Sequence, residues 1–277
     1  MTTTAGIRLV FADMDDTFLA RDKSLPHANL EALDLLAERG IDFVPCTGRP
    51  VTGIPQEVMA HPATRFAVGS NGGLVIDAKT GFVLRRQVMP TSLVTSIYHQ
   101  VRDLDVTFDC FVPGHVLCER RRFEAMEHFG VDAANLQVIK AFREPHDATI
   151  PELIAGYEGV EKVTLYWSRE ADRDAARAAL AARDEIDVTT SHPKNFEFMA
   201  HGTSKGSALT WLCAHVGIEA AQTVAFGDSA NDLPMLVAAG DGVAMANASA
   251  EVRSQADHVC GNCDDGGLGT YLKELLA

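Results

Sequence analysis

The sequence is poor in basic residues. Lys and Arg together number 24 against 38 Asp and Glu, which gives a formal net charge of −14. Proteins that bind the nucleic-acid backbone present a basic face to its phosphates, so this balance argues against nucleic acid as a partner. A small phosphate ester is not excluded, because a few local donors and a metal ion suffice to bind one.

The sequence also lacks a long apolar run. No stretch approaches the roughly 20 apolar residues that span a bilayer, and the start MTTTAGIRLVFADMD has no basic segment of the kind that opens a secretory signal. The six cysteines are scattered, apart from CGNC at Cys260 and Cys263. One such pair without a second is weak evidence for zinc or redox chemistry. We therefore expect a cytoplasmic protein with reduced thiols and no membrane partner.

Several signatures of nucleotide and metal sites are missing as well. The chain has no Walker A loop, no H-E-x-x-H and no G-x-G-x-x-G, and its ten histidines show no metal-ligand spacing. An EF-hand starting at Asp13 fails, because Phe18 stands where Gly is required and Ser24 where Glu is required. The segment GDSAN ends in Asn231 where a nucleophile elbow has Gly, which disfavours a serine hydrolase.

The composition is that of a globular protein. Hydrophobic residues make up 47% of the 277 residues, and this length suggests two domains. Short apolar runs ending in small or polar residues predict buried parallel strands at 7–15, 41–49 and 223–229. A helix over 27–40 separates the first two. This order predicts a βαβ unit in a Rossmann-like α/β core.

The middle of the chain has a different pattern of apolar and polar residues. Its pattern predicts an antiparallel sheet with helices on one face, in a separate α+β module. The expected elements are helices at 91–104 and 169–183, strands at 106–112, 116–121 and 161–167, and a loop at 142–152. The C-terminal part returns to alternating helices and strands. We therefore expect a discontinuous core, 1–86 and 190–277, with a cap domain inserted at 87–189.

Three acidic residues, Asp13, Asp15 and Asp16, follow the first expected strand. Side chains two apart on a strand project to one side, so the carboxylates of Asp13 and Asp15 are expected to point to one spot beyond the carboxyl edge of the sheet. Ligands bind at this edge in open α/β sheets. Asp16 is expected only to shape the turn. Taken alone, the segment is explained equally well by an Asp-rich turn or a helix cap.

A second strand ends in acidic residues. Asp228 closes the strand at 223–229, and Asn231 and Asp232 begin the next helix, where capping alone would also account for them. Two parallel strands that end in carboxylates are more specific than either alone. Together they predict a site of hard oxygen ligands suited to Mg²⁺ and a substrate phosphate.

Two further segments offer phosphate ligands. Thr47 and Gly48 follow another strand, where a hydroxyl and backbone amides can donate, although a small-residue turn has the same pattern. Lys205 lies in the first turn of an expected helix, where the helix dipole disfavours a cation. Its position suggests an anion shared with the helix N-terminus. The alternative is an ordinary lysine facing solvent.

Four motifs in this order resemble the haloacid dehalogenase superfamily of phosphatases: DMDDT at 13–17, TGR at 47–49, the downstream Lys205 and GDSAND at 227–232. SNGG at 70–73 and the C-terminal segments GVAMANA, VRSQADHV and DDGGLGTYL resemble its Cof-type branch, which carries a large α/β cap between the second and third motifs. Asp16 stands where the family often has Gly.

The resemblance implies a role for each matching residue. Asp13 would be the nucleophile that forms an aspartyl-phosphate, and Asp15 the general acid and base. Mg²⁺ would be held by the Asp13 carboxylate, the Asp15 backbone carbonyl and Asp228. Asp232 would support the metal site without binding the ion directly. The residues expected to hold the phosphoryl oxygens are Thr47, Gly48, Lys205 and Asn231.

The expected function is Mg²⁺-dependent hydrolysis of a small phosphorylated metabolite, a sugar phosphate or a phosphorylated cofactor, with a cap that closes over the site. The alternatives are a phosphomutase on the same scaffold and a non-catalytic protein that binds a phosphate ligand. His192 and Asn195 are candidates for substrate contacts, although ordinary residues at the exit of a strand are the simpler explanation. The sequence does not indicate the substrate or the oligomeric state.

Overall fold

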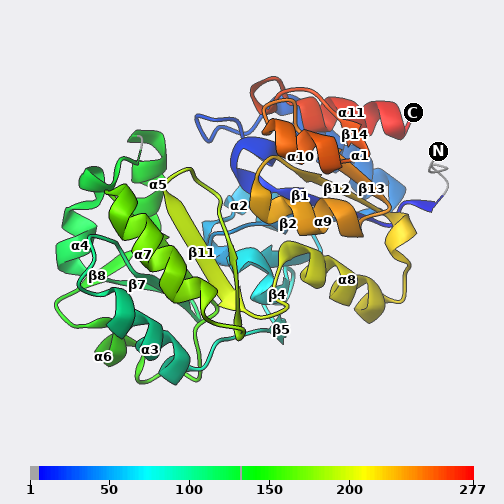
Figure 1. The fold of residues 1–277 in the computed structure, drawn as a ribbon. Helices are drawn as coiled ribbons and strands as arrows, with labels where there is room; N and C mark the ends of the chain where they lie inside the picture. Colours follow the sequence, from blue (N-terminus) through cyan, green and yellow to red (C-terminus); the bar gives the residue numbers. More distant parts are fainter. Residues whose placement is uncertain (1–5, 132) are drawn as a thin grey trace. The chain divides into compact units, whose positions relative to one another are not determined.

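A computed structural model describes residues 6–131 and 133–277, and the chain divides into two compact units (Figure 1). The core unit comprises the chain up to Arg85 together with Ser204–Ala277, and the inserted unit comprises Arg86–Thr203. The second junction lies later than the expected residue 190. The reason is that β11 (Asn195–Ala200) pairs with β9 (Lys162–Tyr166) and so belongs to the sheet of the inserted unit.

The core unit is built on an eight-stranded sheet in the order β14-β13-β12-β1-β2-β3-β4-β5. Its strands are β1 (Leu9–Asp13), β2 (Asp42–Cys46), β3 (Phe66–Gly69), β4 (Leu74–Asp77), β5 (Val83–Arg86), β12 (Thr223–Gly227), β13 (Asp241–Ala244) and β14 (His258–Val259). Neighbours from β14 to β3 run parallel, whereas β4 runs antiparallel to β3. The predicted α/β class with a parallel-sheet core is confirmed.

Helices cover both faces of this sheet, which explains why its strands are almost continuously apolar. Along β1, Val10 belongs to the apolar cluster that contains residues of α1, α2 and α11, whereas Phe11 belongs to the cluster that contains residues of α8, α9 and α10. The helices are α1 (His27–Arg39), α2 (Gln56–Ala60), α8 (Lys205–Val216), α9 (Leu233–Ala238), α10 (Ala250–Gln255) and α11 (Gly267–Leu275). Gly40 ends α1 with a left-handed φ of 66°, at the predicted position.

The inserted unit has a six-stranded sheet in the order β10-β11-β9-β6-β7-β8. In addition to β9 and β11, its elements are α3 (Thr91–Val101), β6 (Asp109–Val112), β7 (His115–Glu119), α4 (Arg120–Glu124), α5 (Ala133–Phe142), β8 (Glu144–His146), α6 (Ile150–Ile154), α7 (Glu170–Ala181) and β10 (Ile186–Thr189). The strand pairs are antiparallel except for β7 with β8. In neither unit do the described residues form a helix with the length and apolar character needed to cross a bilayer.

The prediction of a loop over 142–152 is wrong. This segment contains β8, which pairs with β7, and the first turn of α6. Pro145 is tolerated within β8 because this strand lies at the edge of the sheet. Thr149 begins α6 through a capping box, in which the Glu152 carboxylate accepts from the Thr149 backbone N–H at 2.8 Å.

The two faces of the inserted sheet differ in polarity. One face packs in a single apolar cluster against α3 and α7, which were predicted, and against α6, which was not. The other carries buried ion pairs, Lys162 with Glu197 at 2.6 Å and Arg143 with Asp109 at 2.7 Å. Tyr166 of β9 packs with Ile139 of α5, so this second face also has helical cover that the sequence did not predict.

Candidate active site

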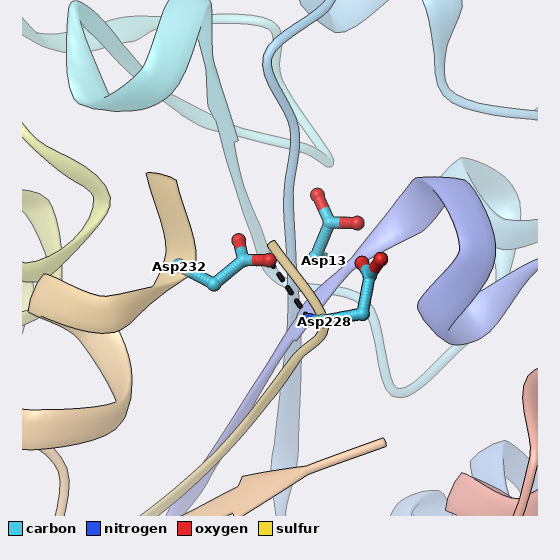
Figure 2. A group of neighbouring side chains, drawn as sticks. All are labelled: Asp13, Asp228 and Asp232. Carbon is cyan, nitrogen blue, oxygen red and sulfur yellow. Dashed lines mark hydrogen bonds between the residues drawn. The ribbon is translucent and has the colours of Figure 1, made fainter. Parts of the chain in front are cut away.

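Three neighbouring strands bring polar residues to one edge of the core sheet. β1 lies between β12 and β2 and runs parallel to both; Asp13 ends β1, Asp228 follows β12 and Thr47 follows β2. Asp13, Asp228 and Asp232 each place a carboxylate oxygen within 4.8 Å of the others (Figure 2). Acidic residues far apart in the sequence therefore form one cluster, because parallel strands end at the same edge.

Asp232 orients the loop after β12. Its Oδ2 accepts a hydrogen bond from the backbone N–H of Asp228, drawn in Figure 2, and another from that of Ser229, both at 3.0 Å. Its Oδ1 accepts from the Lys205 ammonium at 2.6 Å. Gly227 permits this arrangement, since any Cβ at that position would overlap with the Asp232 side chain. Both Asp232 oxygens are thus engaged, which suits a residue that supports a metal site without being a direct ligand.

Lys205 is the first residue of α8 and is fully buried. Its ammonium donates to the carboxylates of Asp13 and Asp232. Burial alone would lower the pKa of Lys205, but these two carboxylates outweigh it and hold the pKa above its ordinary value. The lysine therefore stays charged, and the alternative of a residue facing solvent is wrong.

The remaining carboxylates favour a further cation. Burial raises the pKa of Asp13 well above its ordinary value, with Lys205 opposing and the neighbouring carboxylates adding to the rise. Burial, and then the charge of Asp232, raise the pKa of Asp228 to about 7. The Lys205 ammonium contacts Asp13 and Asp232, and Asp228 adds a third carboxylate to the cluster; hard oxygen donors with excess negative charge are what Mg²⁺ binds. The donor set therefore fits Mg²⁺.

The sequence pattern predicted that Asp15 lies on the same strand as Asp13, and this prediction is wrong. β1 ends at Asp13, and the chain then turns through Met14–Phe18, where Asp15 has extended backbone and Asp16 has a left-handed φ of 59°. The Asp15 carboxylate accepts from the Arg49 Nε at 2.7 Å and lies 3.2 Å from the Lys23 ammonium. Burial would raise the pKa of Asp15, but Arg49 and Lys23 outweigh it and hold the pKa below its ordinary value.

Sequence reasoning did not assign a role to the residues that surround these acids. Lys23 donates to Asp16 at 2.7 Å as well as contacting Asp15, and the Thr17 hydroxyl donates to Asp228 at 2.9 Å. Arg49 stands in the TGR motif, directly after the predicted phosphate ligands, and this adjacency was the available signal. Thr17 likewise ends the DMDDT motif, whereas Lys23 lies outside the quoted motifs and has no comparable signal in the sequence.

The predicted phosphate ligands Thr47, Gly48 and Asn231 also belong to the core unit. Thr47 is buried; its backbone N–H donates to the Val68 carbonyl at 2.9 Å, and its hydroxyl oxygen accepts from the Arg49 N–H at 3.0 Å. Asn231, also buried, donates from Nδ2 to Asn71 Oδ1 at 3.1 Å. Asn71 comes from the SNGG segment, for which no role in the site was predicted.

The other candidates have structural surroundings. The Asn195 side-chain oxygen accepts from the backbone N–H groups of Ser191 and His192, at 3.2 and 3.1 Å, so it closes the turn between β10 and β11. Cys260 and Cys263 are buried free thiols. Burial raises their pKa to about 12 and about 11, so both are protonated at neutral pH and neither is a reactive thiolate.

Comparisons with known proteins point to one family. A family model of haloacid dehalogenase-like hydrolases matches residues 10–272. The chain is 27% identical to the HMP-PP phosphatase of Escherichia coli (strain K12), over 97% of this chain and 96% of that protein. It is 25% identical to the 5-amino-6-(5-phospho-D-ribitylamino)uracil phosphatase YwtE of Bacillus subtilis (strain 168), over 98% and 99%. The solved structure of a haloacid dehalogenase-like hydrolase from B. subtilis has the same fold, with a TM-score of 0.85 at 23% identity, over 98% of this chain and 100% of that chain.

Proposed function

The chain belongs to the haloacid dehalogenase-like hydrolases and is a phosphatase of that family, and we propose that it hydrolyses a small phosphorylated metabolite through an aspartyl-phosphate on Asp13. One observation carries this proposal. A fully buried ammonium, that of Lys205, contacts the Asp13 carboxylate at the edge of the sheet where Thr47 and Asn231 also lie. A carboxylate can approach a phosphate dianion only when positive charge stands beside it.

In the first step an Asp13 oxygen attacks phosphorus. The bond from Asp13 to phosphorus forms, the bond from phosphorus to the ester oxygen breaks, and the departing alkoxide takes a proton from Asp15. Four groups donate hydrogen bonds to the phosphoryl oxygens: the Lys205 ammonium, the Thr47 hydroxyl, the Gly48 amide and the Asn231 amide. These donors bind the charge that spreads over the oxygens in the transition state.

In the second step the Asp15 carboxylate takes a proton from a water molecule, which attacks the phosphorus of the acyl phosphate. Inorganic phosphate leaves and the Asp13 carboxylate is restored. Arg49 and Lys23 hold the pKa of Asp15 below its ordinary value, so the carboxylate is in the deprotonated form that this step requires. The acid role in the first step requires a protonated Asp15, so the contact between Asp15 and Arg49 must open when the ester binds.

Mg²⁺ fits the same edge of the sheet. Asp13, Asp228 and the Asp15 backbone carbonyl would hold it, and Asp232 would orient the Asp228 loop through its two backbone hydrogen bonds. When bound, the ion supplies positive charge that offsets the repulsion between Asp13 and the phosphate ester. It also relieves the crowding of the three carboxylates.

Two relatives support a proposal for the substrate class. The two named above act on HMP-PP and on a phosphorylated ribitylaminouracil, according to their names. We therefore propose a sugar phosphate or a phosphorylated cofactor precursor as substrate. A phosphomutase would use the same aspartyl-phosphate, and a binding protein the same donors, so the experiment must separate these outcomes.

Release of inorganic phosphate from a panel of sugar phosphates, nucleotides and phosphorylated vitamins tests the proposal, with Mg²⁺ and with EDTA. We expect release only with Mg²⁺, and a loss on the order of 10⁴-fold or more in kcat for Asp13→Asn. Asp34→Asn, at an exposed position on α1, is the matched control and should keep full activity. An isomeric ester in place of free phosphate would identify a mutase. An unchanged rate in Asp13→Asn would refute the nucleophile.

A further inference from the structure

The turn between β3 and β4 has an unusual backbone. Ser70, Asn71 and Gly72 follow one another with left-handed φ values of 52°, 54° and 101°. Left-handed backbone is costly for residues that carry a side chain, and it persists only where the surroundings dictate it. Such residues cluster at functional sites, and this turn contacts each of the segments that hold the predicted phosphate ligands.

The first contact is with the segment 47–49. The backbone N–H of Ser70 donates to the Arg49 carbonyl at 2.9 Å, and that of Asn71 donates to the Thr47 carbonyl at 3.1 Å. These two bonds bind the residues on either side of Gly48. The turn therefore fixes the backbone of the segment that carries the proposed phosphate ligands Thr47 and Gly48.

The second contact is with the N-terminus of α8. A Cβ at Gly72 would overlap with the backbone carbonyl of Ser204 and would lie 3.2 Å from the Lys205 nitrogen. Gly72 thus lets the turn lie directly against the residue that caps α8 and against Lys205 itself. Both its φ and this close approach require glycine.

The third contact is made by the Asn71 side chain. Its Oδ1 accepts the hydrogen bond from Asn231 Nδ2 at 3.1 Å, and both side chains are buried. Because a carbonyl oxygen can only accept, it selects the NH₂ end of the Asn231 amide. Nδ2 carries a second hydrogen, which is the one that can serve a phosphoryl oxygen. The reversed amide would offer the phosphate a carbonyl oxygen, which repels it.

We propose that Asn71 is a positioning residue for phosphate binding, which holds the Asn231 amide with its NH₂ group toward the phosphoryl oxygens. This inference rests on the proposed function. It assigns a task to the SNGG segment and explains why a strained conformation is kept there. In this role Asn71 acts through Asn231.

Asn71→Gly isolates this task. Glycine adopts the φ of 54° without strain, so the variant should fold with an unchanged melting temperature while it lacks the Oδ1 acceptor. We expect its dissociation constant for inorganic phosphate, measured calorimetrically with saturating Mg²⁺, to rise about tenfold, the scale of one lost hydrogen bond to a charged group. Ser249→Ala, which removes the cap of α10, should leave phosphate affinity unchanged.

A double-mutant cycle with Asn231→Ala tests whether Asn71 influences phosphate binding through Asn231. If Asn71 acts through Asn231, Asn71→Gly should weaken phosphate binding little further in the Asn231→Ala background. Equal phosphate affinity in Asn71→Gly and the wild type, or fully additive losses in the cycle, would overturn the inference. Phosphate binding is measured without turnover. The role of Asn71 can therefore be tested even if the protein does not hydrolyse the proposed esters.

Discussion

At the scale of single residues, the Asp15 carboxylate is held between two cations, Arg49 and Lys23. Both stabilise its charged form, and together they outweigh the effect of burial on its pKa. A general acid needs its proton before it can donate one. The free protein is therefore set for the base step, and the acid step depends on separating Asp15 from Arg49.

Replacing Arg49 tests this relation. In Arg49→Met, burial should act on the Asp15 pKa with only Lys23 left to oppose it, so the pKa should rise. Because the base form of Asp15 is needed for the second step, the acid limb of the kcat profile should move to higher pH. The measurement is kcat against pH, with Arg21→Met as control, since Arg21 is exposed and pairs with Asp264. An acid limb at the same pH in both variants would contradict the proposal that the contact with Arg49 lowers the pKa of Asp15.

Asp228 gives a second prediction that depends on pH. Its pKa in the folded, metal-free protein is raised to about 7, whereas an unfolded Asp titrates near 3.8. The folded state thus binds the extra proton between these values, and this contribution to stability is lost as pH rises through 7. Mg²⁺ replaces that proton. We expect the rise in melting temperature on adding Mg²⁺ to be larger above pH 7 than below it, and Asp228→Asn to reduce the difference, with Asp13, whose pKa is also raised, accounting for what remains.

At the scale of elements, a buried ion pair ties α5 to the inserted sheet. Asp109 lies on β6, and Arg143, which follows α5, contacts it at 2.7 Å with both side chains almost fully buried. Asp109→Ala leaves the guanidinium buried without its counter-charge. We expect a loss of about 3–5 kcal/mol in the free energy of unfolding, measured with urea. Asp184→Ala, at an exposed position, should change it by less than about 0.5 kcal/mol.

The elements that sequence could predict are those with a strong local pattern. The parallel core was readable because each buried strand is an apolar run that ends in a polar residue, and α1 because its leucines repeat before Gly40. β8 was not, since three residues centred on Pro145 have no strand pattern and pair only because β7 is beside them.

The residues of the candidate site also differ in how far the sequence could predict their placement. Residues at strand ends, such as Asp13 and Asp228, meet because the topology brings every parallel strand to one edge. The setting of Asp15 could not be read from strand periodicity, because the strand stops two residues earlier and the turn after it runs through the left-handed Asp16. Its partner Arg49 lies 34 positions away, and the direction of that side chain is a property of the folded loop.

At the scale of the whole molecule, the two units have separate apolar cores. Two large clusters fill the faces of the core sheet, and two others lie within the inserted unit. The carboxylates, Lys205, Thr47 and Asn231 all belong to the core unit. The inserted unit is therefore not required to assemble the proposed phosphate site. Its contribution should lie in the choice of ester.

Removing the inserted unit tests this division. Arg85 donates to the Ser207 carbonyl at 2.8 Å, so the two ends of the core lie close together and a short Gly-rich linker can replace Arg86–Thr203. We expect this shortened protein to unfold cooperatively and to bind inorganic phosphate with Mg²⁺ within about threefold of the intact chain, because no donor is lost. The same deletion carrying Thr47→Val is the control and should bind phosphate less tightly. A folded core that fails to bind phosphate would mean that the site depends on the inserted unit.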